Sequence, residues 1–362
     1  MFAMTRDPWL DNIKMTLVTL VVVGHSWGLL GATTLDLHLY DFLYYWHIPA
    51  FVLVTGHLSR SFDWDRRHFS SLFTTVVLPY LVFELALLRF RESLGQHEQG
   101  PVWLQPHWAM WYLCVLFFWR LATPVLRRHW AAIPLSVGIS LLGGLYDQLW
   151  FGLPRVLGLL PFFVLGLHLQ RHHLAQLRAP WLKLPALLAL WWIFDFAGNT
   201  DTWARSAFLY YDAPYSDLGF PAGDAMRIRL TVMAIGLLGT ASVLALIPAR
   251  GSWFSRMGSH TLVVYLCHGF FVRYAEYAGW LDWAPEHDVL ALAAVTTLAV
   301  ALALLLASPP VAARLVWLVD PVGSARRSRL PWGGAARRLA RQREDDVGDR
   351  GRDRSRSSPV SR

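Results

Sequence analysis

A lysine and a histidine share one face of the first strongly apolar segment. The stretch "LDNIKMTLVTLVVVGHSW" places Lys14 and His25 eleven positions apart. In an α-helix this spacing leaves the two side chains about 20° from alignment and about 16 Å apart along the axis. A neutral imidazole can accept a proton near pH 7, and an ammonium group suits a phosphate. The pair can therefore supply a general base and an anion-binding charge.

These side chains also have a purely structural interpretation. A lysine near a membrane surface can extend to the headgroups, and a buried histidine can form an interhelical hydrogen bond. The stretch "YYWHIPAFVLVTG" adds His47 directly before Ile48 and Pro49. A proline frees backbone groups that either a watery cavity or neighbouring protein must satisfy. Other polar side chains inside or near the ends of apolar segments, which can simply pair in helix packing, are Glu84, Arg120, Arg155, Tyr265, His268 and Arg273.

The elements that carry these residues are predicted to be transmembrane helices. Only 16% of the 362 residues are charged, whereas about 25% is usual in soluble domains. Several apolar windows reach the roughly 20 residues that cross a bilayer, and they do not alternate as barrel strands do. The fold class predicted is an all-α polytopic membrane protein, a bundle of about ten helices. The expected spans are 13–30, 39–58, 72–88, 108–126, 131–146, 150–169, 181–197, 228–247, 261–278 and 289–307.

Positive charge in the connections predicts the orientation. Arginines concentrate after the second, fourth, sixth and eighth spans, and cytoplasmic loops carry such an excess. An even number of spans then places both termini in the cytoplasm. We expect residues 1–319 to form the transmembrane domain and residues 320–362 a basic, disordered tail, because the tail has few large apolar residues. The net charge of +8 indicates anionic lipid as a partner, not nucleic acid.

Two further features bear on ligands. The two cysteines, Cys114 and Cys267, both fall inside predicted spans, and they suggest neither a disulfide framework nor a metal site. The predicted loop 198–227 mixes aspartates with aromatic residues. Aromatic faces and carboxylates suit a sugar ring and its hydroxyls, but an interfacial loop with aromatic anchors has a similar composition.

Four stretches in order resemble the acyltransferase-3 family of membrane O-acyltransferases, most closely its fucose 4-O-acetylase-like branch. They are "LDNIKMTLVTLVVVGHSW", "YYWHIPAFVLVTGHL", "MWYLCVLFFWR" and "TLVVYLCHGF". Lys14 and His25 match the basic residue and histidine, ten residues between them, of the family's first helix. His47 and Pro49 match the F-H-M-P-x-F motif of its second helix. One departure is that the chain reads "SSLFTTVVLPY" where the family often has R-x-x-R before the proline of its third helix.

The resemblance implies transfer of an acyl group, often acetyl from acetyl-CoA, to a hydroxyl of a sugar or other cell-envelope molecule. In this hypothesis His25 is the general base, His47 positions the substrate or supports His25, and Lys14 contacts the phosphates of CoA. The alternative is a transporter that moves a glycan or lipid-linked intermediate without modifying it, since polar midplane sites and broken helices also occur in transporters. A third possibility is an inactive scaffold protein that keeps the fold.

The expected location is the inner (plasma) membrane of a bacterium. Arginine supplies 31 of the 33 basic residues, which hints at a GC-rich bacterial genome. The sequence does not determine the acceptor, the acyl chain or the oligomeric state.

Overall fold

The described part of the chain is helical throughout. The computed structural model describes residues 7–30, 34–96, 103–147 and 150–329, and no strand occurs among them. The chain forms two compact units, Met1–Leu315 and Val316–Arg362. The predicted all-helical fold class is therefore confirmed for the residues described.

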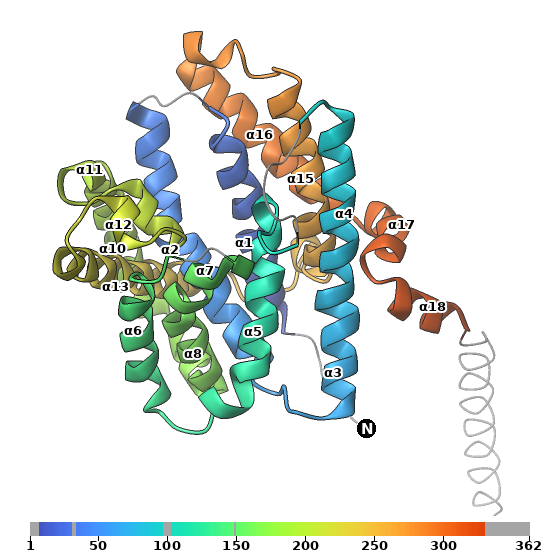
Figure 1. Ribbon diagram of the computed structural model, residues 1–362, viewed down its shortest axis with the longest axis horizontal. Coiled ribbons are helices and arrows are strands. Elements are labelled where there is room, and N and C mark those ends of the chain that lie inside the picture. The colour runs from blue at the N-terminus through green and yellow to red at the C-terminus, as the bar shows by residue number, and fades with distance from the viewer. Residues whose placement is uncertain (1–6, 31–33, 97–102, 148–149, 330–362) are drawn as a thin grey trace, which may run out of the picture. The chain divides into compact units, whose positions relative to one another are not determined.

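Helix α1 (Pro8–Trp27) carries both Lys14 and His25. Asp7 caps its start by accepting a hydrogen bond from the backbone N–H of Trp9, and Pro8 has no N–H that needs a partner. α1 packs against α2 (Thr34–Ser59), α14 (Trp253–Met257), α15 (Thr261–Tyr277) and α16 (Asp288–Ala307). Figure 1 shows α1 between the ribbons of α2 and α15. With helices on several sides, its polar side chains face protein.

Helix α2 carries His47 and continues through Pro49 to Ser59. It packs against α8 (Leu160–His168) and α13 (Ala222–Leu246). Two glycines allow α2 and α8 to touch through their backbones: a Cβ on Gly56 would lie 2.1 Å from Phe163 O, and one on Gly166 would lie 2.0 Å from Leu53 O. Small residues commonly permit such close helix contacts in membranes.

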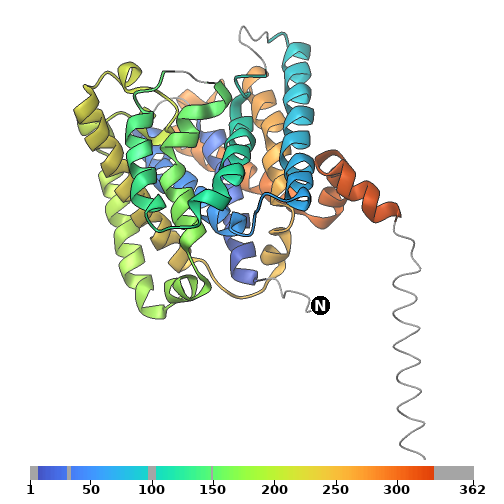
Figure 2. The same ribbon diagram turned by 60° about the horizontal axis from the view of Figure 1, so that its bottom comes forward.

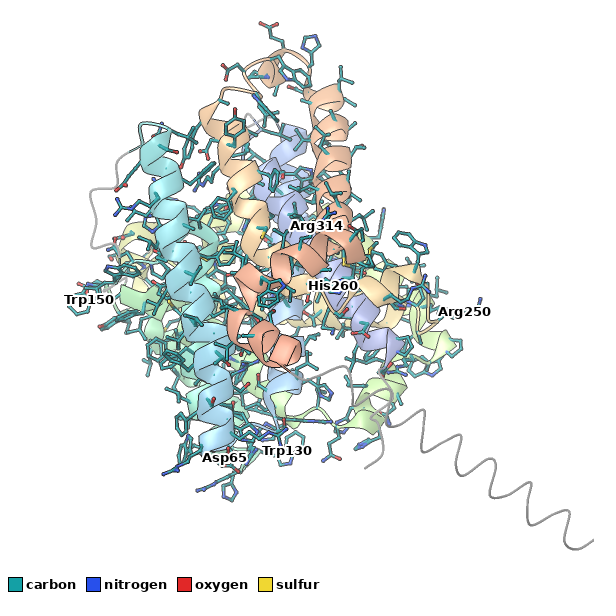
Figure 3. All side chains as sticks on the ribbon, turned by 90° about the vertical axis from the view of Figure 1, so that its right-hand side faces the viewer. Asp65, Trp130, Trp150, Arg250, His260 and Arg314 are labelled. Atoms are coloured by element: carbon teal, nitrogen blue, oxygen red, sulfur yellow. The ribbon has the colours of Figure 1, made fainter. Side chains whose placement is uncertain are left out.

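The third predicted span is one helical rod of three parts. α3 (Arg66–Leu72) begins after Asp65, whose side chain accepts from the His68 N–H, and it continues into the π-helical turn η1 (Phe73–Val77) and α4 (Leu78–Ser93). The wider turn precedes Pro79, which lacks a donor for the helical ladder. In Figure 3, Asp65 and Trp130, which precedes α6, lie at the same end of the bundle.

The remaining helices complete the bundle, and Figure 2 shows several of them side by side. A helix occupies each of the ten segments predicted from hydropathy. The others are η2 (Trp108–Met110), α5 (Trp111–Leu126), α6 (Ala132–Gly143), η3 (Trp150–Gly152), α7 (Leu153–Gly158), α9 (Arg171–Leu177), η4 (Pro180–Leu182), α10 (Lys183–Ala197), α11 (Thr200–Trp203), η5 (Ser206–Tyr210), α12 (Tyr215–Leu218), η6 (Ala284–Glu286) and α17 (Pro309–Val319).

Four helices of the described chain are long and apolar enough to cross a membrane: Arg66–Ser93, Trp108–Leu126, Ala222–Leu246 and Asp288–Ala307. A fifth arises if Trp150–Gly158 and Leu160–His168, which bend by 59° at their junction, form one broken span. The membrane character is therefore supported. The count of about ten spans and the cytoplasmic termini stay predictions.

Connections predicted to share one side of the membrane do lie together. Arg127, after α5, donates to the backbone oxygen of Arg60, after α2, at 2.8 Å. Arg60 in turn donates to Leu169 O, after α8, at 3.3 Å, and Arg178 pairs with Asp7 at 2.6 Å. The basic connections and the start of α1 thus gather at one end of the first unit.

The tail is partly helical. Pro321–Arg329 form α18, and the disorder expected of the tail stays a prediction. The composition that suggested disorder contains helix-compatible alanine and arginine in this stretch. Residues 330–362 lie outside the described part of the chain.

Replacing Gly56 by alanine should destabilise the protein, because the new methyl group would overlap the backbone of α8. Overpacking of this kind costs about 1–3 kcal/mol. Thermal unfolding of the purified protein in detergent measures the loss. Gly138→Ala is the matched control, since a Cβ there meets nothing within 4 Å. Equal unfolding temperatures for the two variants would contradict the close contact.

Candidate active site

A polar cavity of about 470 Å³ lies beside His25. We call it the first cavity. It is bounded by α1, α2, α7, α15, the segment before and at the start of α5, and the loop after η5. Its polar and aromatic lining residues are His25, Tyr40, Tyr44, Trp108, Trp111, Arg155, Tyr210, Asp212, Arg273 and Glu276.

A hydrogen bond joins His25 to a second histidine on α15. His25 Nδ1 and His268 Nε2 are 2.9 Å apart, and the two rings are nearly parallel. His268 is fully buried, whereas His25 is partly exposed and lines the first cavity. The two residues are 243 positions apart in the chain, so only the packing of α1 against α15 brings them together.

The surroundings of His268 fix the protons on both rings. His268 Nδ1 lies 2.7 Å from Tyr265 O and 3.1 Å from Val264 O. Carbonyl oxygens only accept, so Nδ1 carries the hydrogen and Nε2 of the neutral ring is an acceptor. His25 Nδ1 must then donate to His268 Nε2. The proton of neutral His25 therefore sits on Nδ1, and its Nε2 keeps a lone pair for a molecule in the cavity.

Trp108 packs against the rings of both His25 and His268. The two ring centroids are 4.4 Å apart. Trp108 has a φ of 43°, a left-handed conformation that is unusual for a bulky residue. The preceding residue, His107, is anchored by Glu84: its backbone N–H donates to Oε1 at 2.9 Å, and its ring also contacts this carboxylate. Glu84, although remote from the cavity, thus holds the backbone that presents Trp108.

Two arginine–carboxylate pairs lie on the wall of the cavity. Arg155 Nη2 contacts Asp212 Oδ2 at 2.5 Å, and Arg273 pairs with Glu276. Each guanidinium also lies over a tryptophan ring, Arg155 at 4.7 Å and Arg273 at 4.9 Å from the centroid. Each positive charge in the cavity wall therefore has a negative partner, and the site offers hydrogen-bonding groups without a net charge.

The structure separates the three predicted site residues. His47 is buried beside the first cavity but does not line it: its Nδ1 donates to Leu43 O at 2.8 Å and its ring packs on Tyr44, which does. Lys14 is paired with Asp11 at 2.7 Å and lines a different cavity of about 230 Å³. We call this the second cavity. The catalytic role of His47 and the donor-binding role of Lys14 stay predictions.

Several residues of the site were not singled out by sequence reasoning. His268, Arg155 and Arg273 were recognised only as polar residues in or near spans, because pairing in helix packing explains them equally well. Trp108 gave no signal, since the chain contains 19 tryptophans. The 198–227 loop did attract attention for its acids and aromatics, and it supplies Tyr210 and Asp212.

No group of three or more histidine, cysteine, aspartate or glutamate side chains among the described residues could hold a metal ion. Cys114 and Cys267 are both buried and free. The chemistry available at the first cavity is therefore that of an imidazole base, tyrosine hydroxyls and paired charges.

Comparison with known proteins places the chain in a family. The acyltransferase 3 family model, described as an acyltransferase domain, matches residues 7–308. The chain belongs to this family. No curated protein and no solved structure matches it. The match covers every residue that lines either cavity, so this protein is a membrane acyltransferase.

Nuclear magnetic resonance of the ¹⁵N-histidine-labelled acyltransferase tests the proton placement. We expect neutral His25 to carry its hydrogen on Nδ1, because His268 Nε2 accepts it. The His25 signals are assigned by their loss in His25→Gln, and His268→Ala should release the preference for Nδ1. A hydrogen on Nε2 in the native protein would contradict the arrangement.

Glu84→Gln should lower both thermal stability and the acyl-transfer rate. Both donors of buried His107 share Oε1 of Glu84, and the uncharged amide would lose the negative charge that strengthens these hydrogen bonds. Such a loss costs about 1–3 kcal/mol. Thermal unfolding and turnover are measured beside Glu92→Gln, which removes an exposed carboxylate paired with Arg89. Equal unfolding temperatures and equal turnover of the two variants would contradict the anchoring role of Glu84.

Proposed function

We propose that this acyltransferase moves an acyl group, most simply acetyl from acetyl-CoA, onto a hydroxyl of an acceptor bound in the first cavity. The observation that carries the proposal is the hydrogen bond from His25 to His268, which occupies Nδ1 and leaves the Nε2 lone pair free on a histidine that lines the first cavity. An imidazole in this state is a general base for a hydroxyl.

The acceptor we propose is a sugar or another polyhydroxylated molecule of the cell envelope. The charges that line the first cavity are paired, as Arg155 with Asp212 and Arg273 with Glu276. Such a wall can hydrogen-bond hydroxyls without requiring a charged ligand. Tyr40, Tyr44 and the tryptophans add apolar faces suited to the C–H side of a sugar ring. This lining favours an uncharged acceptor, which supports our proposal that the protein belongs to the fucose 4-O-acetylase-like branch.

The chemistry needs one proton transfer in each direction. The acceptor hydroxyl attacks the thioester carbonyl while His25 Nε2 takes its proton, and a new C–O bond forms. Collapse of the tetrahedral adduct breaks the C–S bond, and the thiolate leaves as a thiol after receiving the proton from His25. His268 steadies the charged ring by accepting from Nδ1 throughout. His47 supports the wall through its packing on Tyr44.

The donor is proposed to enter from the cytoplasm, where Lys14 contacts it in the second cavity. This cavity has an apolar lining with positively charged residues, which fits a phosphate-bearing molecule with an extended chain. The Lys14 and His25 positions, about 16 Å apart along α1, span the interval that the acyl arm must cross. The same proposal places the protein in the inner membrane of a bacterium, with both termini in the cytoplasm.

Removal of the base tests the function directly. The purified protein is supplied with radiolabelled acetyl-CoA and extracted cell-envelope glycans. His25→Ala should lower the acyl-transfer rate by about 10²–10⁴, the usual contribution of a general base. His129→Ala is the control, since His129 is exposed and lies outside both cavities. Movement of a glycan across reconstituted vesicles without acetyl consumption would instead identify a transporter.

A further inference from the structure

The second cavity lies at the level of Lys14, between five helical elements. α1, α2, η1, α5 and α15 contribute to its wall. The lining is largely aliphatic and aromatic, with hydroxyl groups and two positive charges among it. The charged and hydroxyl-bearing residues are Lys14, Thr55, Ser59, Thr75, Tyr112, Arg120, Thr261 and Tyr265.

The two positive charges differ in their partners. The Lys14 ammonium group is 2.7 Å from Asp11, so its charge is compensated within α1. Among the described residues, no carboxylate pairs with Arg120 and no group forms a hydrogen bond with its guanidinium, although Tyr112 lies close enough to interact electrostatically. Arg120 is partly buried in the middle of α5. The second cavity therefore carries an uncompensated positive charge on Arg120.

A lone guanidinium inside a membrane span is costly unless something pairs with it. The opposite wall offers no partner, because η1 contributes Thr75 and Val76 to the cavity. This is the helix in which the sequence lacks the basic pair expected from related proteins. The cation of the cavity wall that no carboxylate of the described residues pairs with thus comes from α5, and an anionic ligand would supply its counter-charge.

We infer that Arg120 binds a phosphate group of the acyl donor, a nucleotide thioester with an apolar arm, in the second cavity. This inference rests on the proposed function. A guanidinium presents two parallel N–H donors to phosphate oxygens, which a lysine cannot do. The aliphatic wall accommodates the uncharged arm, and Lys14 adds a weaker attraction because Asp11 already neutralises it.

Side chains that line the second cavity also contact the surroundings of His25. Tyr112 and Tyr265 line it on the side of the first cavity, and their rings are 5.7 Å apart. The Tyr265 hydroxyl donates to Ala109 O, next to the Trp108 that packs against His25. The Tyr265 ring is 6.2 Å from His268. A thioester bound at Arg120 would thus lie near the side chains that contact His268, the partner of the proposed base.

A direct measurement of CoA binding tests this inference independently of the acyl-transfer rate. The protein in neutral detergent is titrated with CoA, which carries the phosphates but no acyl group, and the dissociation constant is measured by calorimetry. Arg120→Gln should weaken CoA binding about tenfold to a hundredfold, the effect of losing charge-assisted hydrogen bonds. Arg120→Lys should retain part of the affinity, because it keeps the charge. Arg89→Gln, outside both cavities, should bind as the native protein does.

Each outcome of these measurements supports or overturns the inference that Arg120 binds the donor phosphate. Unchanged CoA binding in Arg120→Gln, with the same gel-filtration profile and unfolding temperature as native, would overturn the inference. A different result is that the protein fails to bind CoA and is stabilised in phosphatidylglycerol nanodiscs only when Arg120 is present. That result would assign the second cavity to a lipid phosphate and would also overturn the inference. His25→Ala should bind CoA normally. Arg120-dependent CoA binding without any acyl transfer by the native protein would overturn the proposed function and leave this inference standing.

Discussion

The hydrogen bond between His25 and His268 is the interaction on which the site depends. His268 donates from Nδ1 to the backbone of its own helix, so it must accept from His25. This arrangement sets the tautomer of His25 without any carboxylate. A neutral orienting partner avoids the cost of placing another charge in a membrane-embedded site, and the packing of α1 on α15 supplies it.

The two cavities near this histidine pair differ in their polarity and charge. The first cavity carries paired charges and aromatic rings, and the second has an aliphatic wall and Arg120, with which no carboxylate of the described segments pairs. A layer of aromatic side chains that includes Trp108, Tyr112 and Tyr265 lies between them. Two substrates of opposite character, a hydroxyl acceptor and a phosphate-bearing donor, can thus be bound apart and meet at one imidazole.

Rigid backbone features hold this layer. Glu84 fixes His107 and so maintains the left-handed backbone of Trp108. Gly269 leaves room for the indole, since a Cβ there would lie 2.9 Å from Trp108. Strained backbone persists where its surroundings determine it, and here it lies against the proposed base. Glu84 therefore has a structural role that its position in a span did not reveal.

The sequence by itself determined the helical class and the ten apolar segments, and it indicated Lys14 and His25 as candidate site residues, because hydropathy and helical spacing are local properties. It also indicated the 198–227 loop as a ligand-contacting candidate, of which Leu209, Tyr210 and Asp212 line the first cavity. Only the tertiary structure decided that His25 is paired with His268, that Lys14 and His25 line different cavities, and that no carboxylate among the described residues pairs with Arg120. Those facts depend on contacts between helices far apart in the chain, which no local pattern encodes.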